Sequence, residues 1–163
     1  MIRKKILLIG DFGVGKSSLI KRYIDNEFSD KYKTTIGVKI SKKIIYIDNI
    51  ETELLIWDIE GATPVKEIPS SYFKGASGAI FVCDVSRKET IGMLQHHIDN
   101  FLSVNNQAKY VIAYNKSDLL QEKETTTLLA TLNSYEFLVS AKTDFNVTRL
   151  FKTLAKEMIE QYL

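Results

Sequence analysis

The sequence has 163 residues, and 45% of them are hydrophobic and 26% charged, which predicts one domain with a packed core. Its formal net charge of +2 gives no electrostatic reason to expect a nucleic-acid partner. The one cysteine, Cys83, excludes an internal disulfide, and no apolar run is long enough to span a bilayer.

Apolar runs alternate with helical patterns along the whole chain. Predicted strands cover residues 2–10, 38–47, 52–59, 78–86, 108–115 and 135–141. Predicted helices cover residues 15–28, 88–105, 123–133 and 147–163. Residues 48–51 have hairpin turn chemistry, whereas Pro64 and Pro69 make residues 64–75 a poor helix. The alternation predicts an α/β domain over residues 1–163, with a mostly parallel six-stranded sheet, one antiparallel edge strand and helices on both faces.

The stretch GDFGVGKS at residues 10–17 follows the first predicted strand and opens the first predicted helix. It matches the pattern G-x-x-x-x-G-K-[S/T] of phosphate-binding loops and predicts a P-loop NTPase fold. Its glycines let successive backbone N–H groups point at phosphate oxygens, and the helix start adds positive partial charge. Lys16 is expected to reach the β- and γ-phosphates, and Ser17 to offer its hydroxyl to Mg²⁺. The predicted phosphate-binding residues are Gly13, Val14, Gly15, Lys16, Ser17 and Ser18.

The stretch NKSD at residues 115–118 follows the fifth predicted strand. It is expected to select the base of the bound nucleotide. Guanine presents its N1–H and its amine as neighbouring donors, so the Asp118 carboxylate is expected to bind guanine and not adenine. Asn115 is expected to tie this loop to the phosphate loop, and Lys116 to cover one face of the base. The stretch SAK, formed by Ser140, Ala141 and Lys142, follows the last strand, where the Ala141 N–H can meet guanine O6. The NKSD motif disfavours a P-loop kinase or ATPase.

These motifs, in this order and over essentially the whole chain, resemble those of Ras-superfamily small GTPases. The similarity is greatest to Rab proteins. TTIGVKI (residues 34–40) resembles the Rab switch I segment, LLIWD (54–58) the Rab interswitch strand, and residues 70–86 the region after Rab switch II.

The resemblance implies a role for each matching position. Thr35 is expected to coordinate Mg²⁺ and sense the γ-phosphate, and Asp58 to hold Mg²⁺ through a water. The Gly61 N–H is expected to touch the γ-phosphate, Phe28 to pack against the guanine, and Tyr32 to close over the phosphates. Rab proteins present an aromatic triad to effectors. The equivalent positions are Ile40, Trp57 and Tyr72, for which the alternative is ordinary packing between sheet and switch II.

The chain departs from the family pattern D-T-A-G-Q, which here is Asp58-Ile59-Glu60-Gly61-Ala62. Ala62 replaces the glutamine that orients the attacking water, and Phe12 occupies a usually small position where it is expected to obstruct an arginine finger, or to pack on switch II. Glu60 replaces an alanine, and three directions stay open. It can point outward as a surface charge, point inward and repel the γ-phosphate, or position water. The candidate catalytic residues are Lys16, Thr35, Glu60 and Gly61.

Two functions follow as expectations. The first is a guanine-nucleotide switch that recruits effectors through switch I and switch II and hydrolyses GTP slowly. The second is a Rab-like binding module locked in one nucleotide state. Both require GTP or GDP and Mg²⁺, and both involve protein effectors and regulators. We expect a monomer without a direct lipid anchor. We also expect a cytoplasmic location, or a peripheral membrane location if the natural chain carries a lipidated tail.

Overall fold

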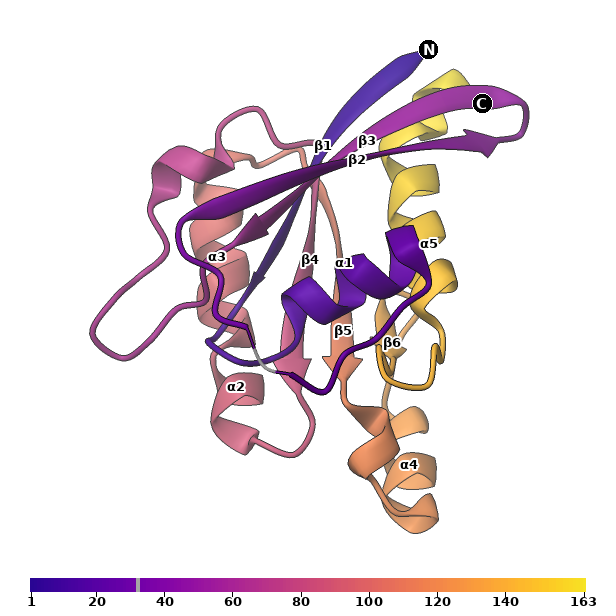
Figure 1. The fold of residues 1–163 in the computed structure, drawn as a ribbon. Coiled ribbons are helices and arrows are strands. Elements are labelled where there is room, and N and C mark those ends of the chain that lie inside the picture. Colours follow the sequence, from indigo (N-terminus) through magenta and orange to yellow (C-terminus); the bar gives the residue numbers. More distant parts are fainter. Residues whose placement is uncertain (32) are drawn as a thin grey trace.

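The computed structural model describes residues 1–31 and 33–163. Its centre is a six-stranded sheet with the strand order β2-β3-β1-β4-β5-β6 (Figure 1). The strands are β1 (Ile2–Gly10), β2 (Val38–Ile47), β3 (Ile50–Ile59), β4 (Gly78–Asp84), β5 (Lys109–Asn115) and β6 (Glu136–Leu138). Only the β2–β3 pair is antiparallel, and the other four pairs are parallel. The predicted fold class, with its antiparallel edge strand, is confirmed.

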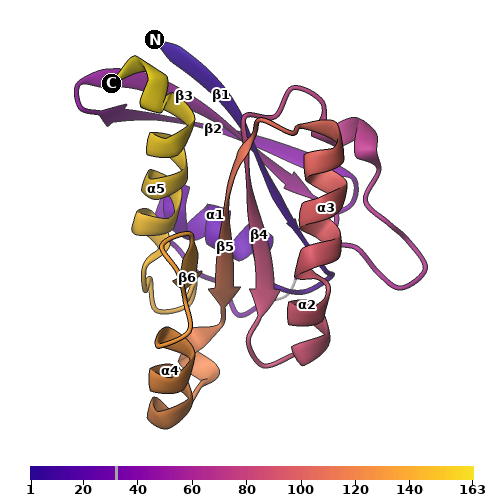
Figure 2. The same ribbon diagram turned by 180° about the vertical axis from the view of Figure 1, so that it is seen from behind.

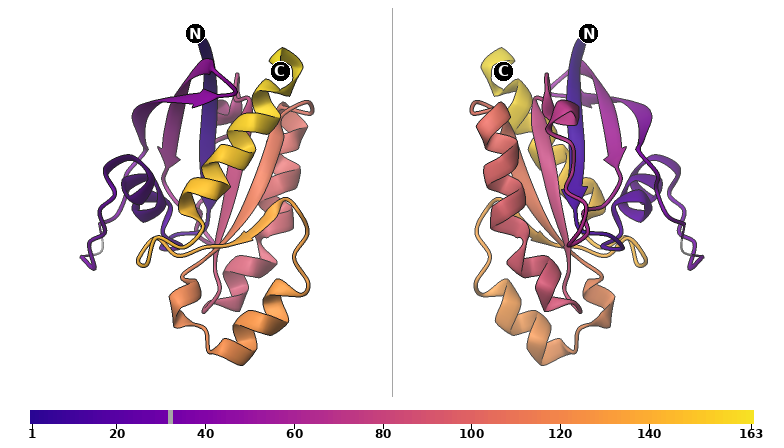
Figure 3. Two further views of the ribbon diagram at one scale, coloured as in Figure 1. Left: turned by 90° about the vertical axis from the view of Figure 1, so that its right-hand side faces the viewer. Right: turned by 90° about the vertical axis from the view of Figure 1, so that its left-hand side faces the viewer.

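Helices cover both faces of this sheet (Figures 1 and 2). They are α1 (Lys16–Asp25), α2 (Lys88–Gly92), α3 (Leu94–Val104), α4 (Glu122–Leu129) and α5 (Val147–Ile159). The side views in Figure 3 show α1 and α3 on opposite sides of the strands. No helix among the described residues is both long enough and apolar enough to cross a membrane.

Two separate apolar clusters lie on the two faces of the sheet. One packs α1 and α5 against it and includes Tyr23 stacked on Phe151, with ring centroids 4.0 Å apart. The other lies under α3, where Phe101 meets Phe81 edge to face at 5.8 Å. Every residue of β4 is buried, as expected of a strand covered on both faces.

One helical prediction was wrong in detail, whereas the structure bears out the prediction of a poor helix over residues 64–75. The predicted continuous helix over residues 88–105 is divided into α2 and α3 at Met93, next to Gly92, a residue with poor helix propensity. The region of Pro64 and Pro69 contains only a short 3₁₀ turn, Ser70–Phe73. The hairpin between β2 and β3 turns at Asp48 and Asn49, both with positive φ (46° and 67°), as in a type I′ turn.

Candidate functional site: a nucleotide pocket at the carboxyl ends of the strands

The phosphate loop joins β1 to α1 and needs its glycines. Gly13 and Gly15 have φ values of 77° and 99°, in the left-handed region that glycine adopts without strain. A Cβ atom at Gly15 would lie 2.4 Å from Nδ2 of the Asn115 side chain, so the phosphate loop and the loop after β5 are in close contact. The loop therefore curves tightly, and α1 begins at Lys16 directly after it.

Lys16 is almost fully buried beneath this loop, with 6% of its surface exposed. Its Nζ donates to the carbonyl oxygens of Gly10 (3.3 Å) and Asp11 (3.2 Å). Burial lowers its pKa to about 8, and the nearby carboxylates of Asp58 and Asp11 oppose this shift. A bound phosphate group would supply a negative charge that favours the ammonium form of Lys16.

Three side-chain oxygens converge where a magnesium ion is expected. Ser17 Oγ lies 2.8 Å from Thr35 Oγ1 and donates a hydrogen bond to Asp58 Oδ2, and Thr35 Oγ1 lies 3.3 Å from the same oxygen. Asp58 is buried, which raises its pKa, although hydrogen bonds from Ser17 and Thr35 and the charge of Lys16 oppose the shift. Its other oxygen, Oδ1, is buried and has no hydrogen-bond partner among the described residues. Hard oxygen donors with one unsatisfied carboxylate oxygen suit Mg²⁺. These residues would hold the ion, which would neutralise phosphate charge when bound.

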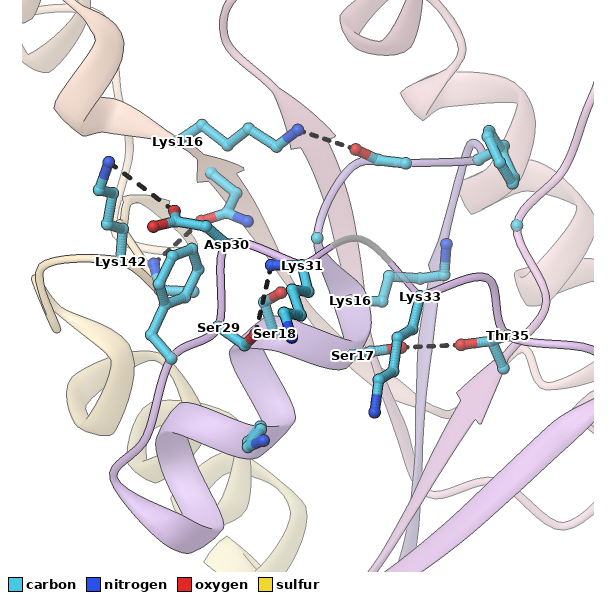
Figure 4. Close-up of a pocket in the computed structure, with 18 of the residues that line it drawn as sticks. Lys16, Ser17, Ser18, Ser29, Asp30, Lys31, Lys33, Thr35, Lys116 and Lys142 are labelled. Carbon is cyan, nitrogen blue, oxygen red and sulfur yellow. Dashed lines mark hydrogen bonds and ion pairs between the residues drawn. The ribbon is translucent and has the colours of Figure 1, made fainter.

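The base loop is tied to the phosphate loop at two points. Asn115 Nδ2 donates to the carbonyl of Val14 (3.0 Å), and Lys116 Nζ donates to the carbonyl of Gly13 (2.9 Å; Figure 4). Lys116 also pairs at 2.9 Å with Asp84, a buried residue that the sequence analysis did not single out. Lys116 has φ 64°, so the base loop passes through a left-handed backbone turn at this residue.

The residues expected to recognise guanine lie together. Asp118 lines the pocket, and its Oδ1 accepts a hydrogen bond from the buried Ser140 hydroxyl at 2.7 Å. The Ala141 N–H, expected to meet guanine O6, here donates to Asn115 Oδ1 at 3.3 Å. Ser140 and Ala141 are therefore joined to the first and last residues of the NKSD motif, Asn115 and Asp118.

The pocket has a volume of about 380 Å³ and opens between the phosphate, base and switch I loops (Figure 4). Most of the predicted nucleotide-binding residues line it, including Ser18, Phe28 and Lys142. Val14 and Ser140 are buried behind it, and Tyr32 lies outside the described residues. Six lysines but only two aspartates contribute to the lining, which suits a polyphosphate. The lysines are Lys16, Lys21, Lys31, Lys33, Lys116 and Lys142.

The segment of residues 58–69, called switch II below, starts at the pocket and then leaves it. Gly61 lines the pocket, whereas Glu60 and Ala62 do not. Phe12 also lines it and is 41% exposed, and its carbonyl accepts a hydrogen bond from Arg87 Nη1 (2.9 Å). The Glu60 carboxylate, whose direction the sequence left open, accepts hydrogen bonds from the Gly37 N–H and the Lys66 ammonium.

The expected partner surface lies on the outer strands. Ile40 is 48% exposed and directly opposite Trp57 in the β2–β3 register. Lys5 lies over the Trp57 ring at 3.7 Å and donates to the Tyr72 carbonyl at 2.8 Å, which links the two aromatic residues of the triad. The buried Trp57 Nε1 has no hydrogen-bond partner within residues 1–31 and 33–163. The sequence did not predict Lys5 as part of this surface. The alternation of side chains along β1 does not show which residues of other elements lie beside a given side chain.

The adjacent histidines of α3 contact two different loops. His97 Nε2 lies 2.8 Å from Asp11 Oδ1 in the phosphate loop and is 5% exposed. His96 Nε2 lies 3.1 Å from Glu67 Oε1 in switch II. No metal-like cluster of three acidic, histidine or cysteine side chains occurs among the described residues. The pair instead connects α3 to the loops around the pocket.

Comparison with known proteins agrees with this geometry. Residues 5–160 match the family model of the Ras family. The chain is 38% identical over 163 residues to the Ras-related protein Rab-1 of Theileria annulata, an alignment that covers 94% of this chain and 73% of that protein. It is 35% identical over 161 residues to the human Ras-related protein Rab-25, with 94% and 75% covered. The chain therefore belongs to the Ras family, as a Rab-like small GTPase of the Ras superfamily.

Proposed function

We propose that this chain is a molecular switch that binds guanine nucleotide with Mg²⁺, recruits protein effectors in its GTP-bound form through switch I and switch II, and hydrolyses GTP weakly. Base selection is assigned to Asp118, and ion binding to Ser17, Thr35 and Asp58. The position of Asp118 in the pocket lining supports the first assignment. Asp58 Oδ1, which has no hydrogen-bond partner among the described residues, supports the second.

The observation that carries the weak hydrolysis is the methyl side chain at position 62. Ala62 has no polar atom to hold a water, is only 7% exposed and does not line the pocket. Intrinsic hydrolysis by Ras-like proteins is on the order of 10⁻⁴ per second, and an arginine from a partner raises it about 10⁵-fold. Both processes use an oriented water, so the unassisted and the assisted rates should each be reduced.

A second function is a hydrolysis-deficient, nucleotide-locked binding module. Phe12 favours it, because this half-exposed ring lines the pocket beside Gly61, where an incoming arginine finger would have to pass. In that case the chain displays one fixed surface to its partners and acts as a scaffold. The exposed Ile40 beside Trp57 is available in either function.

The deciding experiment is chromatography of the nucleotide released from freshly purified protein, followed by single-turnover hydrolysis with and without Ala62→Gln. Released GDP, together with a faster turnover in Ala62→Gln, supports the slow switch. Released GTP with no turnover supports the locked module. Release of adenine nucleotide, or of none and no guanine-nucleotide binding on titration, would contradict both functions.

A further inference from the structure

Switch II is fixed to the phosphate loop by its backbone. Ala62 forms a parallel bridge with Asp11, in which the Ala62 N–H donates to the Gly10 carbonyl at 3.1 Å and the Phe12 N–H donates to the Ala62 carbonyl at 2.9 Å. This bridge continues the parallel pairing of β1 with β3, which runs to Leu8 and Asp58. Switch II therefore begins as an added strand segment beside the phosphate loop.

Gly61 sits in the tightest part of this contact. A Cβ atom there would lie 2.6 Å from Phe12 Cα and 2.7 Å from Phe12 N. Any side chain would force the two backbones apart. The Gly61 backbone therefore lies directly against the loop that is expected to hold the phosphates.

Glu60 joins this contact to switch I. Its backbone N–H donates to the Gly37 carbonyl at 2.8 Å, and one of its carboxylate oxygens accepts the Gly37 N–H at 3.2 Å. The Lys66 ammonium lies 3.1 and 3.2 Å from the two carboxylate oxygens. The Glu60 carboxylate therefore accepts hydrogen bonds from both sides, from the Gly37 N–H in switch I and from the Lys66 ammonium in switch II.

A tight turn brings Lys66 back to Glu60. The Thr63 N–H donates to the Lys66 carbonyl at 3.0 Å, and the Lys66 N–H donates to the Thr63 carbonyl at 3.2 Å. Pro64 stands at the first central position of this turn, where its fixed φ is favourable. The turn at residues 63–66 therefore returns the Lys66 side chain to Glu60, which contacts switch I.

We propose that Glu60 is a positioning residue that latches switch I to switch II, through the Gly37 N–H and the Lys66 ammonium, and so keeps Gly61 against the phosphate loop with either GDP or GTP bound. The proposal rests on the guanine-nucleotide switch proposed above. In a switch without such a latch, the γ-phosphate supplies the contact that orders these segments. Here the chain's own carboxylate and ammonium supply it, so the contact of Glu60 with Gly37 and Lys66 should stay formed in both nucleotide states.

The test is amide hydrogen exchange of Gly37 and Ala62 in the GDP-bound protein and in the protein bound to a non-hydrolysable GTP analogue. In wild type, protection of both amides should be within about twofold between the two states. In the GDP state, exchange should accelerate about threefold in Lys66→Met, which removes an exposed ion pair. It should accelerate about tenfold in Glu60→Ala, which also removes a charge-assisted hydrogen bond.

Lys123→Met is the matched control, because it makes the same change on α4, away from both switch segments. It should leave the exchange unchanged. The double variant Glu60→Ala/Lys66→Met should match Glu60→Ala alone, because both changes break one latch. Wild-type protection that is lost in the GDP state, or additive effects of the two changes, would overturn the proposal.

Nucleotide content is measured on the same samples. Its absence would count against the proposed function, whereas exchange in the nucleotide-free protein would still test the latch.

Discussion

At the scale of single residues, the pocket contains charged side chains that are buried or fixed by hydrogen bonds. Lys16 is buried and close to two carboxylates, and the burial effect is the larger, since its pKa falls to about 8. Asp118 is fixed at the edge of the pocket by the hydrogen bond that its Oδ1 accepts from Ser140. Each of these residues allows a prediction that depends on its charge.

Nucleotide affinity should fall as pH rises above 8. The free protein loses the Lys16 proton near pH 8, and phosphate binding favours the ammonium form, so binding above pH 8 requires proton uptake. The dissociation constant for GDP should be flat below pH 8 and rise by about tenfold per pH unit well above it. Fluorescence titration with labelled GDP at several pH values measures this.

Lys16→Arg serves as the reference for that titration, because arginine stays charged over the whole range. It should bind more weakly but show a shallower pH slope. Titration of the guanine ring affects both proteins and cancels in the comparison. Equal slopes in the two proteins would show that Lys16 is not the titrating group.

Asp118→Asn should exchange guanine preference for xanthine preference, because the xanthine carbonyl accepts from the amide where the guanine amine donated to the carboxylate. The loss of GDP affinity should be about 100-fold, since a charged hydrogen bond contributes up to ~3 kcal/mol. Competition between GDP and XDP for the labelled nucleotide gives the ratio. Asp30→Asn makes the same change at an exposed aspartate of the pocket lining and should keep the GDP preference.

Residue positions were predictable where a local motif sets them, and not where distant residues do. The placement of Lys16, Asn115 and Asp118 follows from motifs at strand ends, because parallel strands bring their carboxyl ends to one edge. The direction of Glu60 depends on Gly37 and Lys66, and the contact of His97 depends on Asp11. Such pairs are far apart in sequence or lie in irregular backbone, so periodicity and spacing contain no information about them.

At the scale of elements, strand prediction was accurate where turn residues mark the strand ends, whereas the last strand is shorter than the predicted residues 135–141. The bounds of β1 and β2 match the predicted residues 2–10 and 38–47, because turn residues mark their ends clearly. The boundary between α2 and α3 was missed, because apolar spacing continues through Met93 although the regular helix is interrupted there. The hairpin between β2 and β3 was recognised from its turn residues, and it supports the surface that carries Ile40 and Trp57.

Asn49→Ala should destabilise this hairpin by about 1 kcal/mol, because alanine is disfavoured in the left-handed conformation that Asn49 adopts. Asn49→Gly should be neutral or slightly stabilising, since glycine suits the second position of a type I′ turn. Urea unfolding of the GDP-bound protein measures the difference. Asn106→Ala, at an exposed loop position, provides the comparison. Equal stability of Asn49→Ala and wild type would contradict the turn assignment.

At the scale of the whole molecule, the pocket joins loops that lie far apart in the sequence. Its lining comes from the loops after β1, β3, β5 and β6 and from the segment between α1 and β2. The termini lie at the other end of the molecule (Figure 1). A ligand in this pocket therefore bridges segments that span nearly the whole sequence.

Bound nucleotide should stabilise the fold as a unit. At a GDP concentration 1,000-fold above its dissociation constant, the gain is about 4 kcal/mol, which corresponds to roughly 8–16 °C in Tm for a domain of this size. Thermal unfolding with GDP and Mg²⁺ measures it, and chelation of Mg²⁺ should reverse part of the shift. ATP is the control ligand and should give little shift. A shift as large as that with GDP would argue against base selection by Asp118.

The position of Trp57 has a practical consequence. It is the only tryptophan in the sequence, and it lies on the outer sheet face between Ile40 and Lys5. Its intrinsic emission therefore reports this one surface without any label. A docking partner that removes water from the ring should shift the emission to shorter wavelength, while a ligand that fills only the nucleotide pocket should leave it nearly unchanged. The molecule thus has a built-in optical signal that separates partner binding from nucleotide binding.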